Sequence, residues 1–132
     1  MSSDSRTVLI VDDEAQIRLL VERMLKSRPV RILSAPKPSE ALRICETEPV
    51  DLLISDIDMP EMQGNKLAER VLRLRPETAV LLISGHYDEA PRVNVPGRVE
   101  FLRKPFFPAD MVRLLGEMLE GSRQGAKTQT EE

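Results

Sequence analysis

The chain has 132 residues, of which 41% are hydrophobic and 31% are charged, and its net charge is −3. This length is enough for one domain with a substantial core. The small negative charge gives no basis for direct nucleic-acid binding, and a single cysteine excludes an intrachain disulfide.

The sequence shows no pattern typical of a membrane span or a signal peptide. The apolar runs are too short to span a bilayer, and the first residues lack the apolar core of a signal peptide. A lone cysteine fits a reducing compartment. We therefore expect a cytoplasmic protein without a membrane partner.

The first half of the chain alternates apolar runs with helical periodicity. Residues 1–5 are polar and are expected to be disordered. Strands are expected at 7–11, 30–33 and 52–54. The helix after the first strand, with Asp12 or Asp13 as a cap, should turn one stripe toward the core, and the helix that opens at Pro38 should do the same. The inward residues are Ile17, Leu20, Val21, Met24 and Leu25 in the first helix, and Ala41, Leu42 and Cys45 in the second.

The second half continues the alternation with one irregular stretch. A helix opens at Gly64, strands are expected at 79–83 and 99–102, and the last helix at 108–120. Prolines between the last two strands leave room for one or two helical turns, around 87–93. The tail at 121–132 should be disordered. Inward residues are Leu67, Val71 and Leu74 in the third helix, and Met111, Leu114, Leu115, Met118 and Leu119 in the last.

Five strand–helix units in strict alternation predict an α/β fold. The sheet should be parallel, with helices on both faces and right-handed crossovers. The run at 52–54 is apolar throughout, as in a strand buried on both faces. It leads directly to Asp56, and Pro60 then ends the strand.

Four of the five expected strands end in residues that can do chemistry. In a parallel sheet these ends share one edge, where open α/β sheets bind ligands. Clustered carboxylates repel one another unless one is protonated or a cation lies among them, and Mg²⁺ suits such oxygen ligands. A lysine and a hydroxyl complete a cradle for a phosphoryl group, with Asp56 as nucleophile. The residues are Asp12, Asp13, Asp56, Ser84 and Lys104.

Each of these residues also has an ordinary structural explanation. Asp13 alone can be a helix cap, Asp56 and Ser84 can be turn residues, and most lysines, such as Lys104, lie on the surface. Only their shared position at one edge favours a common site. His86, the single histidine, is better explained as a solvated loop residue than as a ligand.

The combined motif resembles the receiver domain of two-component response regulators, over about residues 6–120. It consists of Asp12-Asp13, Asp56 with Met59-Pro60 and Gly64, Ser84, and Lys104-Pro105-Phe106, in that order on successive strands. The resemblance implies a flavodoxin-like fold with sheet order 2-1-3-4-5, here with a short or irregular fourth helix. The Ser-Gly-His string and the short following loop are similar to receivers attached to hybrid sensor kinases.

The resemblance also implies a role for each site residue. Asp56 would accept a phosphoryl group from a histidine kinase or a histidine phosphotransfer protein. Asp13 and Asp56 would bind Mg²⁺ directly, Asp12 through water and Asp58 through its backbone carbonyl. Ser84 would bind a phosphoryl oxygen. Lys104 would pair with the acceptor carboxylate or with the phosphoryl group.

A further set of expectations concerns switching and output. Phe101 matches the family's switch aromatic, although a core strand residue explains it equally well. Asp58 and His86 each lie two residues beyond a site residue and are expected to modulate the dephosphorylation rate. The domain would be a signalling module rather than an enzyme in the usual sense, apart from self-catalysed phosphorylation and dephosphorylation. Its output would be an unidentified protein, and a homodimer stays open.

Two other functions compete with this interpretation. The Asp-x-Asp at Asp56 and Asp58 also occurs in phosphohydrolases of the haloacid dehalogenase type, but there it follows the first strand of the catalytic core, and Asp12-Asp13 would be unexplained. A degenerate receiver that binds a partner without phosphate is the second alternative, and the intact acids and lysine argue against it.

Overall fold

A five-stranded parallel sheet organises the molecule, and its strand order is β2-β1-β3-β4-β5. The computed structural model describes residues 6–85 and 92–123, with side chains described up to residue 120. The elements in chain order are β1 (Arg6–Val11), α1 (Ala15–Leu25), β2 (Val30–Ala35), α2 (Pro38–Thr47), β3 (Leu52–Asp56), α3 (Gly64–Leu74), β4 (Ala79–Ser84), β5 (Val99–Arg103) and α4 (Pro108–Arg123). The predicted flavodoxin-like fold class and sheet order are confirmed.

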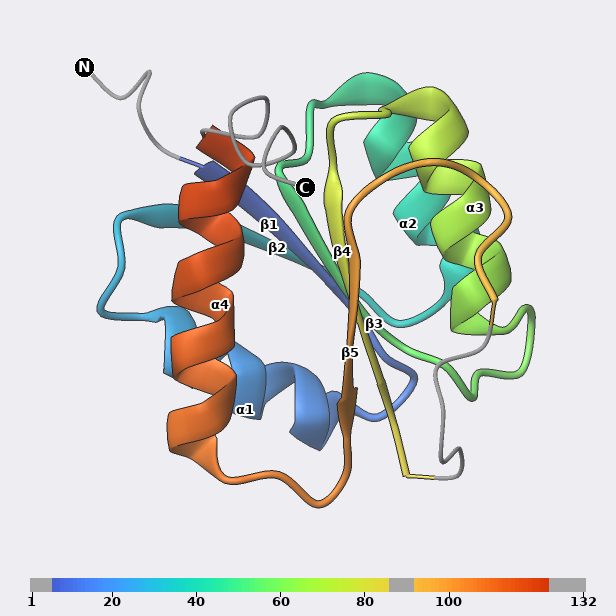
Figure 1. Ribbon diagram of the computed structural model, residues 1–132. Coiled ribbons are helices and arrows are strands. Elements are labelled where there is room, and N and C mark those ends of the chain that lie inside the picture. The colour runs from blue at the N-terminus through green and yellow to red at the C-terminus, as the bar shows by residue number, and fades with distance from the viewer. Residues whose placement is uncertain (1–5, 86–91, 124–132) are drawn as a thin grey trace.

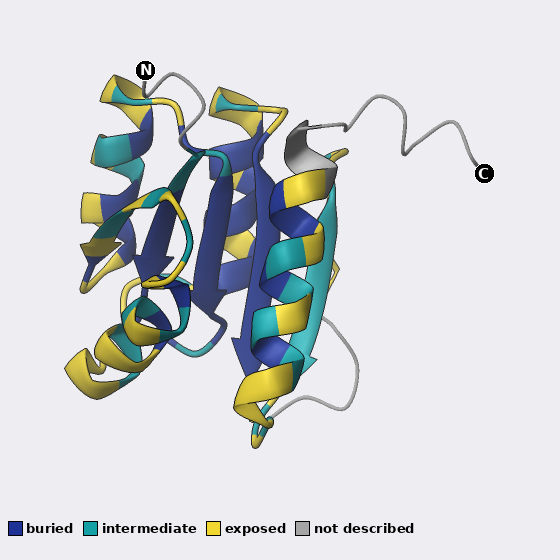
Figure 2. Ribbon diagram, turned by 90° about the vertical axis from the view of Figure 1, so that its left-hand side faces the viewer, coloured by how far each residue is buried: buried dark blue, intermediate teal, exposed yellow. Residues whose placement is uncertain are grey.

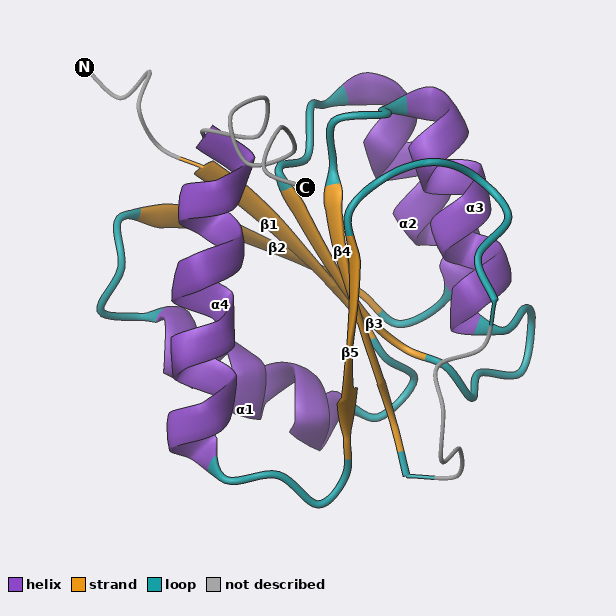
Figure 3. Ribbon diagram, in the orientation of Figure 1, coloured by secondary structure: helices purple, strands orange, loops and turns teal. Residues whose placement is uncertain are grey.

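The helices cover both faces of the sheet, α1 and α4 on one and α2 and α3 on the other (Figure 1; Figure 3). Two apolar cores result, one on each side. The central strands β3 and β4 are buried along their whole length, whereas the edge strands β2 and β5 are partly exposed (Figure 2). This explains why the runs at 52–54 and 79–83 are apolar on both strand faces. None of the described helices is long and apolar enough to cross a bilayer.

Two residues expected in the core are exposed instead. Leu20 on α1 is 40% exposed and Leu74 at the end of α3 is 45% exposed. Each residue continues the apolar periodicity of its helix. Periodicity predicts the face of the helix on which a side chain lies, but not whether a neighbouring element extends far enough to cover that side chain. Val21 and Leu25 on α1, and Leu67 and Val71 on α3, are fully buried as predicted.

Helix ends also differ from expectation. Neither Asp12 nor Asp13 is the N-cap of α1, because that position is Glu14, whose side chain makes no capping bond. The last helix continues past Glu120 to Arg123. Glycine weakens a helix by about 1 kcal/mol but does not forbid it, so Gly121 did not end the helix. The expected disorder of 1–5 and of most of the tail falls on residues outside the described ones.

The connection between β4 and β5 contains no helix within its described part, residues 92–98. Most of the expected helical turns fall on residues 86–91, which lie outside the described residues. The described part instead packs on α3. The backbone N–H of Asn94 donates to the buried Glu69 carboxylate at 2.8 Å, and Val93 and Val95 pack against the core on that side. The described part of this connection therefore packs on the side of the sheet that α2 and α3 cover.

Candidate functional site

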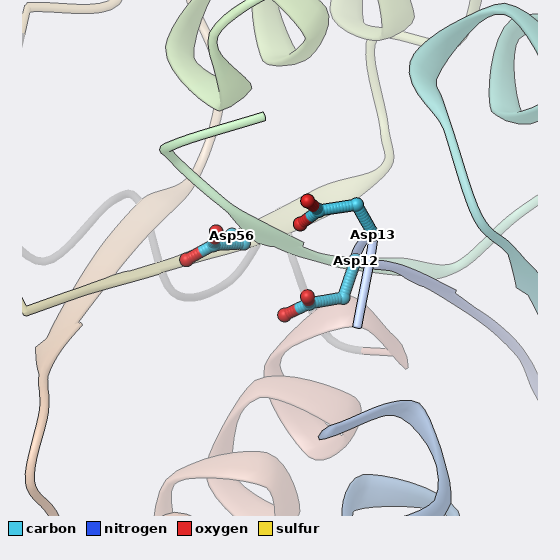
Figure 4. A group of neighbouring side chains, drawn as sticks. All are labelled: Asp12, Asp13 and Asp56. Atoms are coloured by element: carbon cyan, nitrogen blue, oxygen red, sulfur yellow. The ribbon is translucent and has the colours of Figure 1, made fainter. Parts of the chain in front are cut away.

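Three carboxylates meet at the carboxyl edge of the sheet, at the ends of β1 and β3. Oxygen atoms of Asp12, Asp13 and Asp56 all lie within 4.8 Å of one another. Asp12 and Asp13 come from the loop after β1 and extend toward the side on which Asp56 lies (Figure 4). Adjacent parallel pairing of β1 with β3 brings the two strand ends together. The clustering expected from the sequence is therefore present.

Burial makes the charged form of two of these acids unfavourable. Asp12 is 3% exposed and Asp56 is 8% exposed. The pKa of Asp12 is raised to about 6, mainly by burial; the hydrogen bond from the Glu14 backbone lowers it, and the charge of Asp56 adds to the increase. Burial likewise raises the pKa of Asp56, opposed mainly by Lys104. Such a site gains stability when a cation shares it.

Lys104 supplies a positive charge at this edge. Its ammonium Nζ lies 3.4 Å from Asp56 Oδ1, and the peptide bond to Pro105 is cis. Lys104 follows β5, while Asp56 ends β3, so the fold and not the local sequence makes this contact. One lysine against three carboxylates leaves the cluster with excess negative charge. The donor set is all oxygen, so the residues present fit a hard divalent cation such as Mg²⁺.

Ser84 and Asp58 form a pair that the sequence did not predict. Ser84 is fully buried at the end of β4. Its hydroxyl donates to Asp58 Oδ2 at 3.1 Å. The Asp58 carboxylate is therefore directed toward Ser84, and it is not one of the three clustered carboxylates. The sequence places both residues near one edge of the sheet but does not pair them, because the pairing depends on how the loop after β3 folds.

The other expected site residues are placed as follows. Phe101 on β5 is partly buried and packs against the core beneath α2 and α3. Cys45 is buried, and burial raises the pKa of its thiol to about 11, as expected for a small core residue. His86 lies outside the described residues.

Two close contacts shape the loops that carry the acids. The Gly64 N–H donates to the Ile57 carbonyl at 2.8 Å, and a Cβ at Gly64 would lie 2.3 Å from the Asp56 carbonyl oxygen. On the other side, Arg18 Nη1 on α1 donates to the Asp12 carbonyl at 2.7 Å. Sequence reasoning included Gly64 through its motif but missed Arg18. Arginines near the start of a helix are common, so the position of Arg18 in the sequence did not mark it as a site residue.

The burial of Asp12 leads to a pH-dependent stability in the absence of divalent metal. A pKa raised from its ordinary value of 3.8 to about 6 stabilises the folded state below pH 3.8, and this contribution is lost as the pH rises through 6. The asparagine side chain does not titrate, so Asp12→Asn should not lose this contribution. We therefore expect the difference in unfolding free energy, Asp12→Asn minus wild type, to be about 1–3 kcal/mol larger at pH 7 than at pH 4. Urea unfolding in EDTA at both pH values measures the difference. An equal difference at the two pH values would contradict the prediction.

A flavodoxin-like sheet with clustered acids, a lysine and a hydroxyl at its carboxyl edge defines a class of magnesium- and phosphoryl-binding domains. Within this class, the family model for the response regulator receiver domain matches residues 8–116. The chain therefore belongs to the response regulator receiver domain family. This is a family of signalling domains and not of classical enzymes.

Relatives in both sequence and structure agree with this assignment. The chain is 36% identical over 122 residues to the sensor kinase CckA of Brucella abortus (strain 2308), a match that covers 89% of the chain and 13% of the kinase. It is 28% identical to the response regulator receiver protein CpdR of the same strain, covering 86% of the chain and 97% of CpdR. A solved receiver domain of the hybrid histidine kinase CckA is similar with a TM-score of 0.73, 30% identity and coverage of 86% of this chain and 98% of that one.

The family places the chain in two-component phosphorelay signal transduction. Receiver domains bind Mg²⁺ at an acidic pocket, are phosphorylated in a Mg²⁺-dependent reaction, and interact with histidine kinases or phosphotransfer proteins. The chain spans only 13% of CckA and 28% of the transcriptional regulatory protein GlrR of Escherichia coli (strain K12). It matches one domain of these longer proteins.

Proposed function

We propose that Asp56 is the residue of this receiver that accepts the phosphoryl group. The observation that carries the proposal is the meeting of Asp56 with Lys104 at 3.4 Å beside the carboxylates of Asp12 and Asp13. Asp56 is the acid of the cluster that Lys104 contacts directly, and this cation opposes the burial that raises the pKa of Asp56, so it favours the charged, nucleophilic carboxylate. A carboxylate oxygen would attack the phosphorus, and the phosphorus–nitrogen bond of a phosphohistidine would break with its electron pair passing to the imidazole.

The metal would be held by Asp13 and Asp56, by Asp12 through water and by the backbone carbonyl of Asp58. When bound, Mg²⁺ would neutralise charge on the phosphoryl oxygens and the acceptor. Lys104 would pair with the acceptor or with the phosphoryl group. Asp13 is exposed, whereas Asp12 and Asp56 are buried, so one side of the cluster is open to water and to the phosphodonor. This exposure supports the proposed roles of the three acids.

Phosphorylation would act as a switch through Ser84. The phosphoryl group adds strong acceptor oxygens next to a hydroxyl that now donates to Asp58. Ser84 would leave Asp58 for a phosphoryl oxygen, and Phe101, partly buried on the neighbouring strand, would turn inward. The connection between β4 and β5 would follow, changing the surface offered to an output protein.

A mass measurement with a small phosphodonor tests this function. Incubation with Mg²⁺ and acetyl phosphate should give a stable adduct of about 80 Da, the mass of one phosphoryl group. A phosphohydrolase of the haloacid dehalogenase type would instead turn over and release phosphate. A phosphate-independent binding module would do neither. Slow loss of the adduct without other proteins would measure the proposed self-catalysed dephosphorylation.

Asp58 and His86 are proposed to set the lifetime of the phosphoryl group. Asp58 lies beside Ser84 and close to the acceptor, where it can orient or repel the attacking water; His86 is included from its spacing alone. We expect Asp58→Ala, His86→Ala and the double variant to change the phosphoryl half-life severalfold. Thermal midpoints should move by only a few degrees, as for substitutions outside a packed core. Unchanged half-lives in all three variants would end this proposal.

The domain boundaries and the location also stay proposals. Residues 6–120 would form the folded receiver, and limited proteolysis should trim the chain close to these bounds. A free, buried Cys45 suits a reducing compartment such as the cytoplasm, which cell fractionation can test. A histidine kinase or phosphotransfer protein would be the donor. Sedimentation with and without the phosphoryl group would test for a homodimer.

A further inference from the structure

The loop between β1 and α1 presents two of the three clustered acids, and three hydrogen bonds fix its first residue, Asp12. The Asp12 N–H donates to the Ala35 carbonyl at 3.3 Å. One Asp12 carboxylate oxygen accepts the Glu14 N–H at 2.9 Å. The Asp12 carbonyl accepts Nη1 of Arg18 at 2.7 Å. Of the three, the Arg18 bond is the shortest and has a charged donor, and such bonds are roughly twice as strong as neutral ones.

The peptide that Arg18 contacts is the one that joins Asp12 to Asp13. Fixing the carbonyl of this peptide fixes its plane, and the plane sets the direction in which the Asp13 side chain leaves the backbone. Helix α1 offers no other side-chain support here, because its N-cap Glu14 makes no capping bond and its first turn has no acidic residue. Asp13 is exposed, so packing does not hold it either.

Arg18 contacts the backbone of the site, through the Asp12 carbonyl, whereas the cation in contact with a clustered carboxylate is Lys104, at Asp56. The two possible effects of Arg18 on a bound divalent cation have opposite signs. A guanidinium charge acting through space would repel Mg²⁺, so its removal would tighten binding. A guanidinium that orders the ligand loop would favour Mg²⁺, so its removal would weaken binding.

We infer that Arg18 is a positioning residue that holds the Asp12–Asp13 peptide in the orientation required for divalent-cation binding. The inference rests on the proposed Mg²⁺ site at Asp12, Asp13 and Asp56. Arg18 touches neither the metal nor the phosphoryl group in this role. It reduces the cost of ordering an exposed ligand, which would otherwise be paid on binding.

Mg²⁺ titration by calorimetry in the folded protein tests this inference, well below the thermal midpoint. Arg18→Met removes the donors and the charge at similar length, and we expect it to weaken Mg²⁺ binding about tenfold, as for other groups that support a metal ligand. Arg18→Lys keeps the charge and one flexible donor, and should restore part of the affinity. Arg23→Met is the matched control, because it removes the same charge from an exposed position of the same helix and should leave the affinity unchanged.

The outcomes separate this inference from the proposed function. Wild-type binding that is lost in Asp13→Ala establishes the site independently of Arg18. If Arg18→Met then binds Mg²⁺ as tightly as wild type, or more tightly, the inference is overturned and the site stands. If wild type does not bind Mg²⁺, both are overturned. A lower thermal midpoint in EDTA with unchanged Mg²⁺ affinity would show a merely structural role and would also overturn the inference.

Discussion

Asp56→Asn is expected to abolish the formation of the phosphoryl adduct while leaving the fold intact. An amide cannot form an acyl phosphate, so the variant should show no gain of about 80 Da after incubation with Mg²⁺ and acetyl phosphate. The amide has nearly the shape of the carboxylate, which keeps the packing of a residue that is 8% exposed. Because burial raises the pKa of Asp56, removing its charge should hold or raise the thermal midpoint in EDTA.

A second aspartate next to the same strand provides the control. Asp51 lies before β3, at the opposite end from Asp56, where it accepts the Thr7 N–H at 2.8 Å. Asp51→Asn keeps an acceptor oxygen for that bond and should be phosphorylated as fully as wild type. Full labelling of Asp56→Asn would contradict the assignment and would move the acceptor to Asp12, Asp13 or Asp58.

The sheet and its chemical edge could be predicted because both follow from local patterns. Apolar runs of strand length mark buried strands, and strict alternation with helices requires parallel pairing. Parallel pairing then places every carboxyl end at one edge, whatever the details of packing. Asp12, Asp13 and Asp56 could therefore be grouped from their positions after strands, and their clustering within 4.8 Å in the structure agrees.

Features that depend on the tertiary environment were not predictable in this way. Leu20 and Leu74 have the period of core residues but lie where no neighbouring element covers them. The hydrogen bonds of Arg18 to Asp12 and of Ser84 to Asp58 join side chains to partners chosen by the fold. The sequence alone does not identify the hydrogen-bond partner of a polar residue, so these contacts are seen only in the folded structure.

The burial of the acids at this edge of the sheet makes the folded state costly to form. Asp12 and Asp56 are desolvated by the strands that position them, and burial raises the pKa of both. Such strain is typical of functional sites, where stability is given up for pre-organisation. The loops around the acids therefore need close backbone contacts to hold their shape, and Gly64 is the point at which such a contact is tightest.

Gly64→Ala is expected to destabilise the protein strongly and to disrupt the proposed acceptor site at Asp56. A Cβ at this position would lie 2.3 Å from the Asp56 carbonyl oxygen and 2.9 Å from the Ile57 Cα. Both are backbone atoms and cannot rotate away, so the start of α3 must move off the end of β3. Overpacking of this kind costs about 3 kcal/mol, and the shift would also move the Asp56 carboxylate away from Lys104. Urea unfolding and the rate of adduct formation measure the two effects.

Gly85→Ala is the matched control for Gly64→Ala, because it adds the same methyl group at the same edge of the sheet. Among the described residues, the new Cβ would meet only the Lys104 side chain, at 3.5 Å, which is ordinary van der Waals contact. We expect Gly85→Ala to unfold within about 1 kcal/mol of wild type, since no overpacking arises. A Gly64→Ala variant as stable as Gly85→Ala would show that the loop after β3 can relax. The tight contact between α3 and the Asp56 carbonyl would then not be needed to hold Asp56 in place.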